Sequence, residues 1–220
     1  MLVSASIMNI NILELKEKLN ELIEGGITMF HLDIMDGNYV PNLSYSVKTI
    51  AEIKEVYPQI VFDVHLMVNN PLEYIEPLSE ANVEYFSFHS DSTRFVRRTI
   101  DKARSRGLKP GIVINPSQQI DSVEPYANYV DMVTVMTVEP GFAGQSFLEG
   151  GIERLRELTM IRKRLGCNFV INVDGGADYA ICDKCYHMGI DIVVGTIHNI
   201  FKQPEGLKNA CIKFNNMYNK

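Results

Sequence analysis

Short apolar runs alternate with longer amphipathic segments along the whole chain of 220 residues. The runs have the length of buried strands, and each precedes a segment with the three-to-four-residue periodicity of a helix. Strands are predicted at Leu2–Met8, Met29–Met35, Ile60–Met67, Tyr85–His89, Lys109–Asn115, Met132–Val138, Phe169–Asp174 and Ile192–Gly195. Helices are predicted after them at Ile12–Glu24, Ser46–Val56, Leu72–Ala81, Thr93–Arg106, Ile120–Tyr126, Glu149–Leu165, Tyr179–Met188 and Gly206–Met217.

This alternation of strand and helix predicts a parallel sheet, and eight such units predict a closed (β/α)₈ TIM barrel. Gly25, Gly107, Gly166 and Gly189 stand where four of the helices should end, shortly before the next strand. No linker, low-complexity tract or change in composition divides the chain, so residues 1–220 are predicted to form a single domain. An open, doubly wound sheet is the alternative arrangement of the same units.

Composition and charge argue against several classes of protein. A hydrophobic share of 46% and a charged share of 22% are ordinary for a chain with one large core, not for a disordered one. The formal net charge of -6 argues against a nucleic-acid partner, which needs a broad basic surface. No apolar run approaches the roughly 18 residues of a membrane span, and the first residues do not resemble an export signal. We expect a cytoplasmic protein without a membrane partner.

The four cysteines are Cys167, Cys182, Cys185 and Cys211. In a chain of this size without an export signal, they are expected to be reduced thiols. Cys182 and Cys185 match the C-x-x-C pattern of redox and zinc sites, but they lie in a predicted helix and no second pair exists. We interpret them as two helix residues one turn apart.

Polar side chains at the ends of three predicted strands need an explanation. Because strand residues alternate between the barrel interior and the helices, His31 and Asp33, His65, and Asp174 all point inward. They lie at the carboxyl ends of the strands, where barrel enzymes have their active sites. One such histidine alone would be interpreted as a hydrogen-bonded core residue. Buried carboxylates need an opposite charge, however, so the four together predict a divalent metal ion. Zn²⁺ suits these donors best, and Fe²⁺, Mn²⁺ and Co²⁺ are alternatives.

Glycine-rich segments follow the last three predicted strands. They are Glu139-Pro-Gly-Phe-Ala-Gly-Gln145, Gly175-Gly176 and Gly195-Thr196. Backbone N–H groups in such turns can bind a phosphate without any lysine, and barrels often have a phosphate site at this place. Glycines also make tight turns without binding anything, but three consecutive glycine loops favour a small anionic ligand.

These segments together resemble the ribulose-phosphate 3-epimerase family over nearly the whole chain. The matching motifs are Ser4-Ala-Ser6-Ile-Met8, His31-Leu-Asp33-Ile-Met35-Asp36-Gly37, Val40-Pro41-Asn42, Asp63-Val-His65-Leu-Met67, Met136-Thr-Val-Glu-Pro-Gly-Phe-Ala-Gly-Gln145 and Val173-Asp174-Gly175-Gly176. The resemblance implies a barrel of the ribulose-phosphate-binding type, an isomerase, and a metal ion held by His31, Asp33, His65 and Asp174. It also implies a sugar-phosphate site formed by Ser6, Met35, His65, Met67, Met136, Gly141, Phe142, Ala143, Gly144, Gly175, Gly176, Gly195 and Thr196.

Three departures from the family pattern concern the substrate. Pentulose-phosphate enzymes usually have Leu-Ser-Ala-Asp, Gly-Phe-Gly-Gly-Gln and Gly-Ser where this chain has Met8-Asn-Ile-Asn11, Gly141-Phe-Ala-Gly-Gln145 and Gly195-Thr196. These segments are more similar to the branch that converts D-allulose 6-phosphate to D-fructose 6-phosphate, which is favoured here. Conversion of D-ribulose 5-phosphate to D-xylulose 5-phosphate is the alternative, because Asp174-Gly-Gly resembles the pentulose group. The segment Ile197–Phe201 is a residue longer than either pattern.

Inverting a carbon beside a ketone requires one proton-transferring group on each face. Asp33 and Asp174 come from strands that are not neighbours in the ring, so we expect them to flank the substrate as general base and general acid. The methionines either fill the barrel or shield an enediolate from water. His89 could contact the site, but packing is the favoured interpretation. Asn38–Asn42 is a loop long enough to cover a bound sugar.

Two competing classes are a barrel decarboxylase, whose Asp-x-Lys-x-x-Asp pattern is absent, and a non-catalytic sugar-phosphate binder, which needs no metal. A homo-oligomer is expected.

Overall fold

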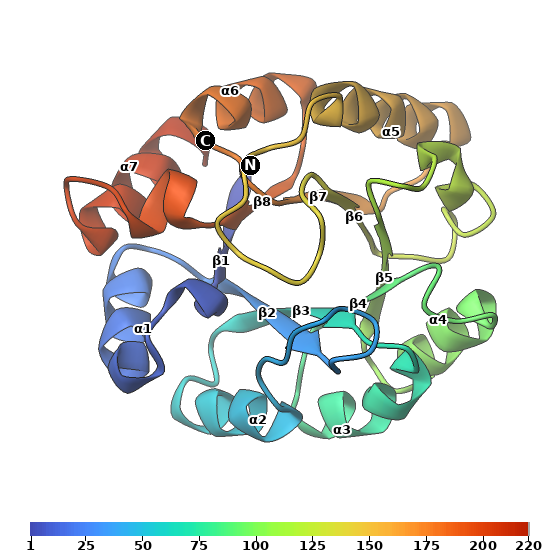
Figure 1. Ribbon diagram of the computed structural model, residues 1–220, viewed down its shortest axis with the longest axis horizontal. Coiled ribbons are helices and arrows are strands. Elements are labelled where there is room, and N and C mark those ends of the chain that lie inside the picture. The colour runs from blue at the N-terminus through green and yellow to red at the C-terminus, as the bar shows by residue number, and fades with distance from the viewer. Residues whose placement is uncertain (220) are drawn as a thin grey trace.

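Eight parallel strands close into a ring in the computed structural model, which describes residues 1–219. Figure 1 shows this ring surrounded by helices. Neighbouring strands pair in chain order, and the first strand closes the ring by pairing with the eighth. The strands are β1 Leu2–Ser6, β2 Met29–Met35, β3 Val61–Met67, β4 Tyr85–His89, β5 Lys109–Ile114, β6 Met132–Met136, β7 Val170–Asp174 and β8 Ile192–Gly195. The predicted TIM barrel is confirmed, and the open doubly wound alternative is wrong.

The main hydrophobic core lies between the strands and the helices. Leu32, Val64 and Ile171 on the strands are fully buried, as are Leu22 and Leu158 on the helices. These strand residues face outward to the helices. Their immediate neighbours along each strand therefore face the barrel interior. The helices are α1 Leu15–Glu24, α2 Val47–Val56, α3 Ile75–Glu80, α4 Val96–Ser105, α5 Gly151–Leu165, α6 Tyr179–Met188 and α7 Leu207–Tyr218.

The helix predicted between β5 and β6 is wrong. Instead of a helix over Ile120–Tyr126, only a short 3₁₀ turn forms at Ile120–Val123. Pro125 has no N–H group and its ring clashes with the carbonyl of the preceding turn, so an α-helix cannot continue through it. The described residues therefore contain seven α-helices around eight strands.

Helices α1, α3, α4 and α5 begin two or three residues later than predicted, and for α4 and α5 the local reason is plain. Helix α4 begins at Val96, because the Phe95 N–H donates to Thr93 Oγ1 at 3.1 Å in a turn that competes with helix. Helix α5 begins at Gly151, because Gly150 has a φ of 81°, outside the right-handed helical region.

The long segment after β8 forms a π-helical turn over Ile197–Phe201. A π turn holds more residues than an α turn, which explains how the extra residue is accommodated. The Thr196 N–H donates to Asn199 Oδ1 at 2.8 Å, and the His198 N–H donates to Thr196 Oγ1 at 3.3 Å. This turn therefore has a fixed position beside the barrel mouth.

All four cysteines are free thiols. Cys182 and Cys185 are buried on α6, and burial raises the pKa of each thiol to about 12. Their interpretation as helix residues one turn apart is confirmed. Across residues 1–219, every helix is too short or too polar to cross a membrane.

Candidate metal centre and active site

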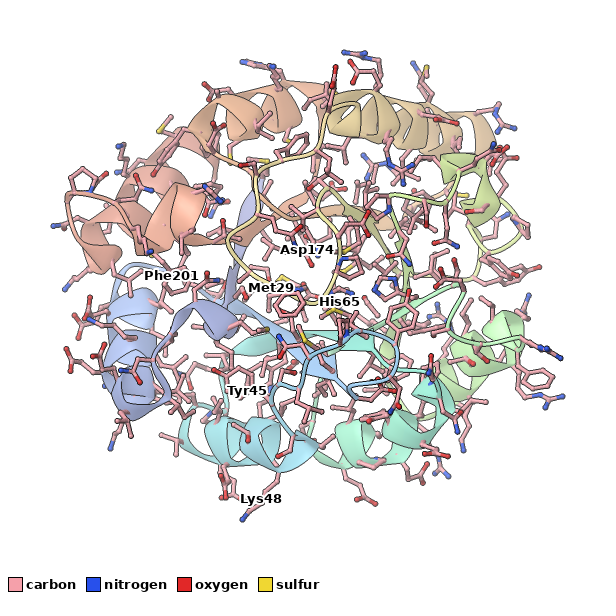
Figure 2. All side chains as sticks on the ribbon, viewed as in Figure 1. Met29, Tyr45, Lys48, His65, Asp174 and Phe201 are labelled. Carbon is pink, nitrogen blue, oxygen red and sulfur yellow. The ribbon has the colours of Figure 1, made fainter. Side chains whose placement is uncertain are left out.

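Four side chains meet inside the mouth of the barrel. His31 and Asp33 come from β2, His65 from β3 and Asp174 from β7, and each is between 1% and 9% exposed. Figure 2 shows His65 and Asp174 near the middle of the ring. The parallel register places Asp33 of β2 beside His65 of β3. Strand alternation and strand order thus bring together the four residues that the sequence singled out.

Each histidine offers one ring nitrogen to both carboxylates. His31 Nε2 lies 3.2 Å from Asp33 Oδ1 and 3.3 Å from Asp174 Oδ2. His65 Nδ1 lies 3.1 Å and 3.2 Å from the same two oxygens. All four atoms lie within 4.8 Å of one another. Ligand atoms around a tetrahedral Zn²⁺ ion lie about 3.4 Å apart, so this donor set fits one divalent ion.

The charges of this cluster compensate one another despite complete burial. Burial alone would lower the pKa of His31, but the carboxylates of Asp33, Asp63 and Asp174 outweigh it and hold this pKa well above its usual value. Burial alone would raise the pKa of Asp174, but attraction to His31 and hydrogen bonds with both histidines lower it. Without a metal ion, a proton on His31 therefore supplies the positive charge that the carboxylates need.

Metal affinity is therefore expected to increase with pH. A histidine nitrogen must lose its proton before it can bind a metal, and the raised pKa of His31 keeps that proton in place around neutral pH. Between about pH 6 and about pH 8, the Zn²⁺ dissociation constant should fall roughly tenfold per pH unit for each proton released. Isothermal titration calorimetry in buffers of different ionisation enthalpy measures that proton release. An affinity independent of pH would contradict this picture of the cluster.

Two residues outside the predicted site contact the ring nitrogens of His31 and His65 that do not face Asp33 and Asp174. His31 Nδ1 lies 2.8 Å from Asp63 Oδ2, and His65 Nε2 lies 2.8 Å from His89 Nε2. Burial lowers the pKa of His89 well below its usual value, and the nearby His65 lowers it further, so His89 is neutral and can accept a hydrogen bond. His89 therefore contacts the site directly instead of only packing. The alternation that identified His65 also sends Asp63 inward, so the sequence did contain this signal.

A cleft opens above the cluster. Its walls contain almost all the residues predicted to surround the substrate: Ser6, Asp33, Met35, His65, Met67, Met136, Gly141, Phe142, Ala143, Gly144, Asp174, Gly175, Gly176 and Thr196. The methionines Met35, Met67 and Met136 are the last residues of β2, β3 and β6. They are buried and uncharged, so they present sulfur and methyl groups to the cleft.

Gly195 does not line this cleft. A Cβ atom there would lie 2.5 Å from Ile200 Cδ1 and 2.9 Å from Val3 Cγ2, so glycine is needed for close packing of β8. Its predicted place around the substrate stays a prediction. Residues that the sequence analysis did not assign also line the cleft: Met8, Asn9, Val138, Glu139, Pro140, Gln145, Val194 and His198.

The loops after β6 and β7 enclose the end of the cleft. In Figure 1 the loop between β6 and α5 extends across the middle of the ring. Gly176 is required where these loops meet, because its φ is 66° and a Cβ atom would lie 2.3 Å from the Phe147 nitrogen. Among the described residues that line the cleft, none is a lysine or an arginine. An anion here would therefore be bound by backbone N–H groups or by neutral side chains.

The loop after β2 contacts the loop after β6 over the mouth. Asn42 Nδ2 donates to the Gly141 carbonyl at 2.8 Å, and Val40 packs against Gly141. On the other side, the Tyr39 hydroxyl donates to Asp91 Oδ1 at 2.8 Å. The segment Asn38–Asn42 thus lies where the sequence predicted a covering loop.

Residues 2–200 match the model of the ribulose-phosphate 3 epimerase family. The chain belongs to this family. The resemblance drawn from the motifs is confirmed, and with it the class of enzyme, because epimerases are isomerases.

Relatives with this name cover most of the chain. The ribulose-phosphate 3-epimerase of Aquifex aeolicus is 35% identical over 178 residues, or 81% of this chain and 80% of that protein. The ribulose-phosphate 3-epimerase of Methanocaldococcus jannaschii is 33% identical over 192 residues, or 87% of this chain and 81% of that protein. Among solved structures, 3-hexulose-6-phosphate synthase from Salmonella typhimurium matches with a TM-score of 0.75 at 16% identity, over 99% of this chain and 100% of that one. That likeness concerns the fold alone.

Proposed function

We propose that this protein inverts the C3 carbon of a ketose phosphate with the help of one divalent metal ion. The observation that carries this proposal is the pair of carboxylates, Asp33 and Asp174, that contact both histidines at the base of a glycine-walled cleft. Family membership supports the same reaction. A divalent ion would be held by these four residues, and it would supply the positive charge that stabilises an enediolate. Zn²⁺ is the first candidate, and Fe²⁺, Mn²⁺ and Co²⁺ suit the same donors.

The two aspartates approach the substrate from different sides. Asp33 is on β2 and Asp174 is on β7, and β1 and β8 separate these strands in the ring. Burial would raise the pKa of each carboxyl, but the nearby histidines lower both values, so each aspartate is ionised and available as a base near neutral pH. We assign one aspartate to remove the C3 proton and the other to return a proton to the opposite face. The direction of the reaction decides which aspartate acts first.

D-ribulose 5-phosphate is the first candidate substrate, because the relatives at 33–35% identity carry the ribulose-phosphate name. D-allulose 6-phosphate is the second candidate, and its support comes from Met8, Asn9, Ala143 and Thr196. Met8, Asn9 and Ala143 line the cleft, as does Thr196, so these departures from the pentulose pattern lie where the sugar would bind. The sequence preference for allulose 6-phosphate stays a prediction.

Steady-state assays of the purified, metal-loaded protein on both sugar phosphates test this proposal. A kcat/KM for ribulose 5-phosphate well above that for allulose 6-phosphate supports the first candidate. The reverse order supports the second. Turnover of neither sugar would refute the proposed reaction.

Phosphate binding by the loop after β6 gives a separate prediction. Gly144→Val should raise KM for the phosphorylated sugar at least about tenfold and leave the metal content unchanged, because a Cβ atom at Gly144 would have only Ile197 Cδ1, at 3.7 Å, within 4 Å. Gly107→Val is the matched control. Gly107 has a similar φ of 83° against 85° for Gly144, but it lies beyond α4 at the opposite end of the barrel. An unchanged KM in Gly144→Val would place the phosphate elsewhere.

We also propose that the protein is a homo-oligomer. Large apolar side chains after β1 and β2 are exposed to solvent: Ile12 by 58%, Leu13 by 90% and Leu43 by 72%. Burial of such side chains against another copy would be favourable. Light scattering that returned the mass of one chain would refute this proposal.

A further inference from the structure

A third buried carboxylate lies beneath the four residues of the candidate metal centre. Asp63 on β3 has no exposed surface and does not line the cleft. Its Oδ2 accepts a hydrogen bond from His31 Nδ1 at 2.8 Å, from Ser4 Oγ at 3.3 Å and from Asn172 Nδ2 at 3.2 Å. Donors on β1, β2 and β7 thus hold this carboxylate in one position.

The bond between Asp63 and His31 determines which nitrogen of the imidazole carries the proton. A neutral imidazole has one N–H group and one unprotonated nitrogen. Because the Asp63 carboxylate only accepts, Nδ1 keeps its proton in both the charged and the neutral ring, and the proton that His31 loses on becoming neutral comes from Nε2, which gains the lone pair. That Nε2 atom is the one that lies 3.2 Å from Asp33 Oδ1 and 3.3 Å from Asp174 Oδ2. The lone pair of His31 is therefore directed to the place where a metal ion would bind.

We propose that Asp63 is a positioning residue, which fixes the tautomer and the ring orientation of His31 and makes its Nε2 a stronger ligand. The inference rests on the proposed metal centre. Asp63 acts through His31 and touches neither the cleft nor the other three residues of the centre. It is anchored by two strands besides that of His31, so the ring orientation is set before any ion binds.

Zn²⁺ affinity, measured by competition with a chromophoric chelator and without any substrate, tests the proposal. Asp63→Ala should bind Zn²⁺ roughly 10- to 100-fold more weakly than the unaltered protein. Asp63→Asn keeps an acceptor of the same shape but loses the charge, so its affinity should lie between the two. Ser87→Ala is the matched control, because Ser87 is buried to a similar extent and its hydroxyl bonds to Met132 Sδ, not to Asp63 or to a candidate ligand. It should leave the affinity within about threefold of the original.

The unaltered protein provides a second readout that does not depend on how the variants fold. In the Zn²⁺-loaded protein, ¹⁵N chemical shifts of the His31 ring should show the proton on Nδ1. A proton on Nε2 would overturn the proposal, as would an Asp63→Ala variant that is folded by circular dichroism and has unchanged affinity. Neither result would contradict the proposed epimerisation. Failure of the unaltered protein to bind any divalent ion would instead refute the metal centre itself.

Discussion

Asp174→Asn is expected to lower the rate of epimerisation by roughly a thousandfold, the range for loss of an acid–base group. The amide cannot take or return the C3 proton, although it has nearly the shape of the carboxylate. Asp174 is at the end of β7 and lines the cleft, so the change removes the only proton-transferring side chain proposed for that face. Steady-state assays with the metal-loaded variant give the rate.

Exchange of the C3 proton in D₂O separates the role of Asp174 from that of Asp33. With Asp33 intact, Asp174→Asn should still exchange the proton of the one epimer whose hydrogen faces Asp33, and Asp33→Asn should do so for the other epimer. Both aspartates are also candidate metal ligands, so each variant must first be shown to retain its ion. A metal-loaded Asp174→Asn protein with a near-normal rate would refute the two-carboxylate mechanism.

His65→Ala is expected to lose the metal ion. His65 Nδ1 lies 3.1 Å and 3.2 Å from the two aspartate oxygens, so its removal deletes one of four donors and leaves a void beside them. Loss of a residue that only hydrogen-bonds to a ligand weakens metal binding by at most roughly a hundredfold. The Zn²⁺ affinity of His65→Ala should fall by more than that, and activity should fall with it. Elemental analysis of the purified variant measures the bound metal.

His187→Ala is the matched control for this prediction. His187 is an exposed histidine in the last turn of α6, so its loss should change neither metal content nor activity. Retention of about one ion per chain by His65→Ala would contradict the assignment of His65 as a ligand.

Features that depend on local periodicity were predictable from the sequence. The alternation within β2 and β3 was sufficient to send His31, Asp33 and His65 inward, and the eight repeated units implied that β7 brings Asp174 to the same mouth. Strand alternation has a period of two, so a strand assigned within a residue or two still has each side chain on the correct face.

Features that depend on distant contacts were not predictable. Asp63 bonds with Ser4 and Asn172, which are 59 and 109 residues away in the sequence, so its role is visible only after the ring has closed. For the same reason the sequence did not decide between packing and site contact for His89, whose partner His65 belongs to another strand. Gly195 belonged to a glycine-rich pattern, but the space around it is filled by side chains of β1 and of the π turn.

The central claim is tested most directly by proton NMR in D₂O. Each sugar phosphate is incubated with the purified protein, once with its metal ion and once without, and the signal of the C3 proton is followed. The account predicts that one of the two sugars is converted to its C3 epimer with deuterium at C3, because the proton returned to the opposite face comes from solvent. It also predicts that a chelator stops the conversion and that about one divalent ion per chain restores it. Equal conversion by the metal-free protein, or a product that keeps the original proton at C3, would contradict the account.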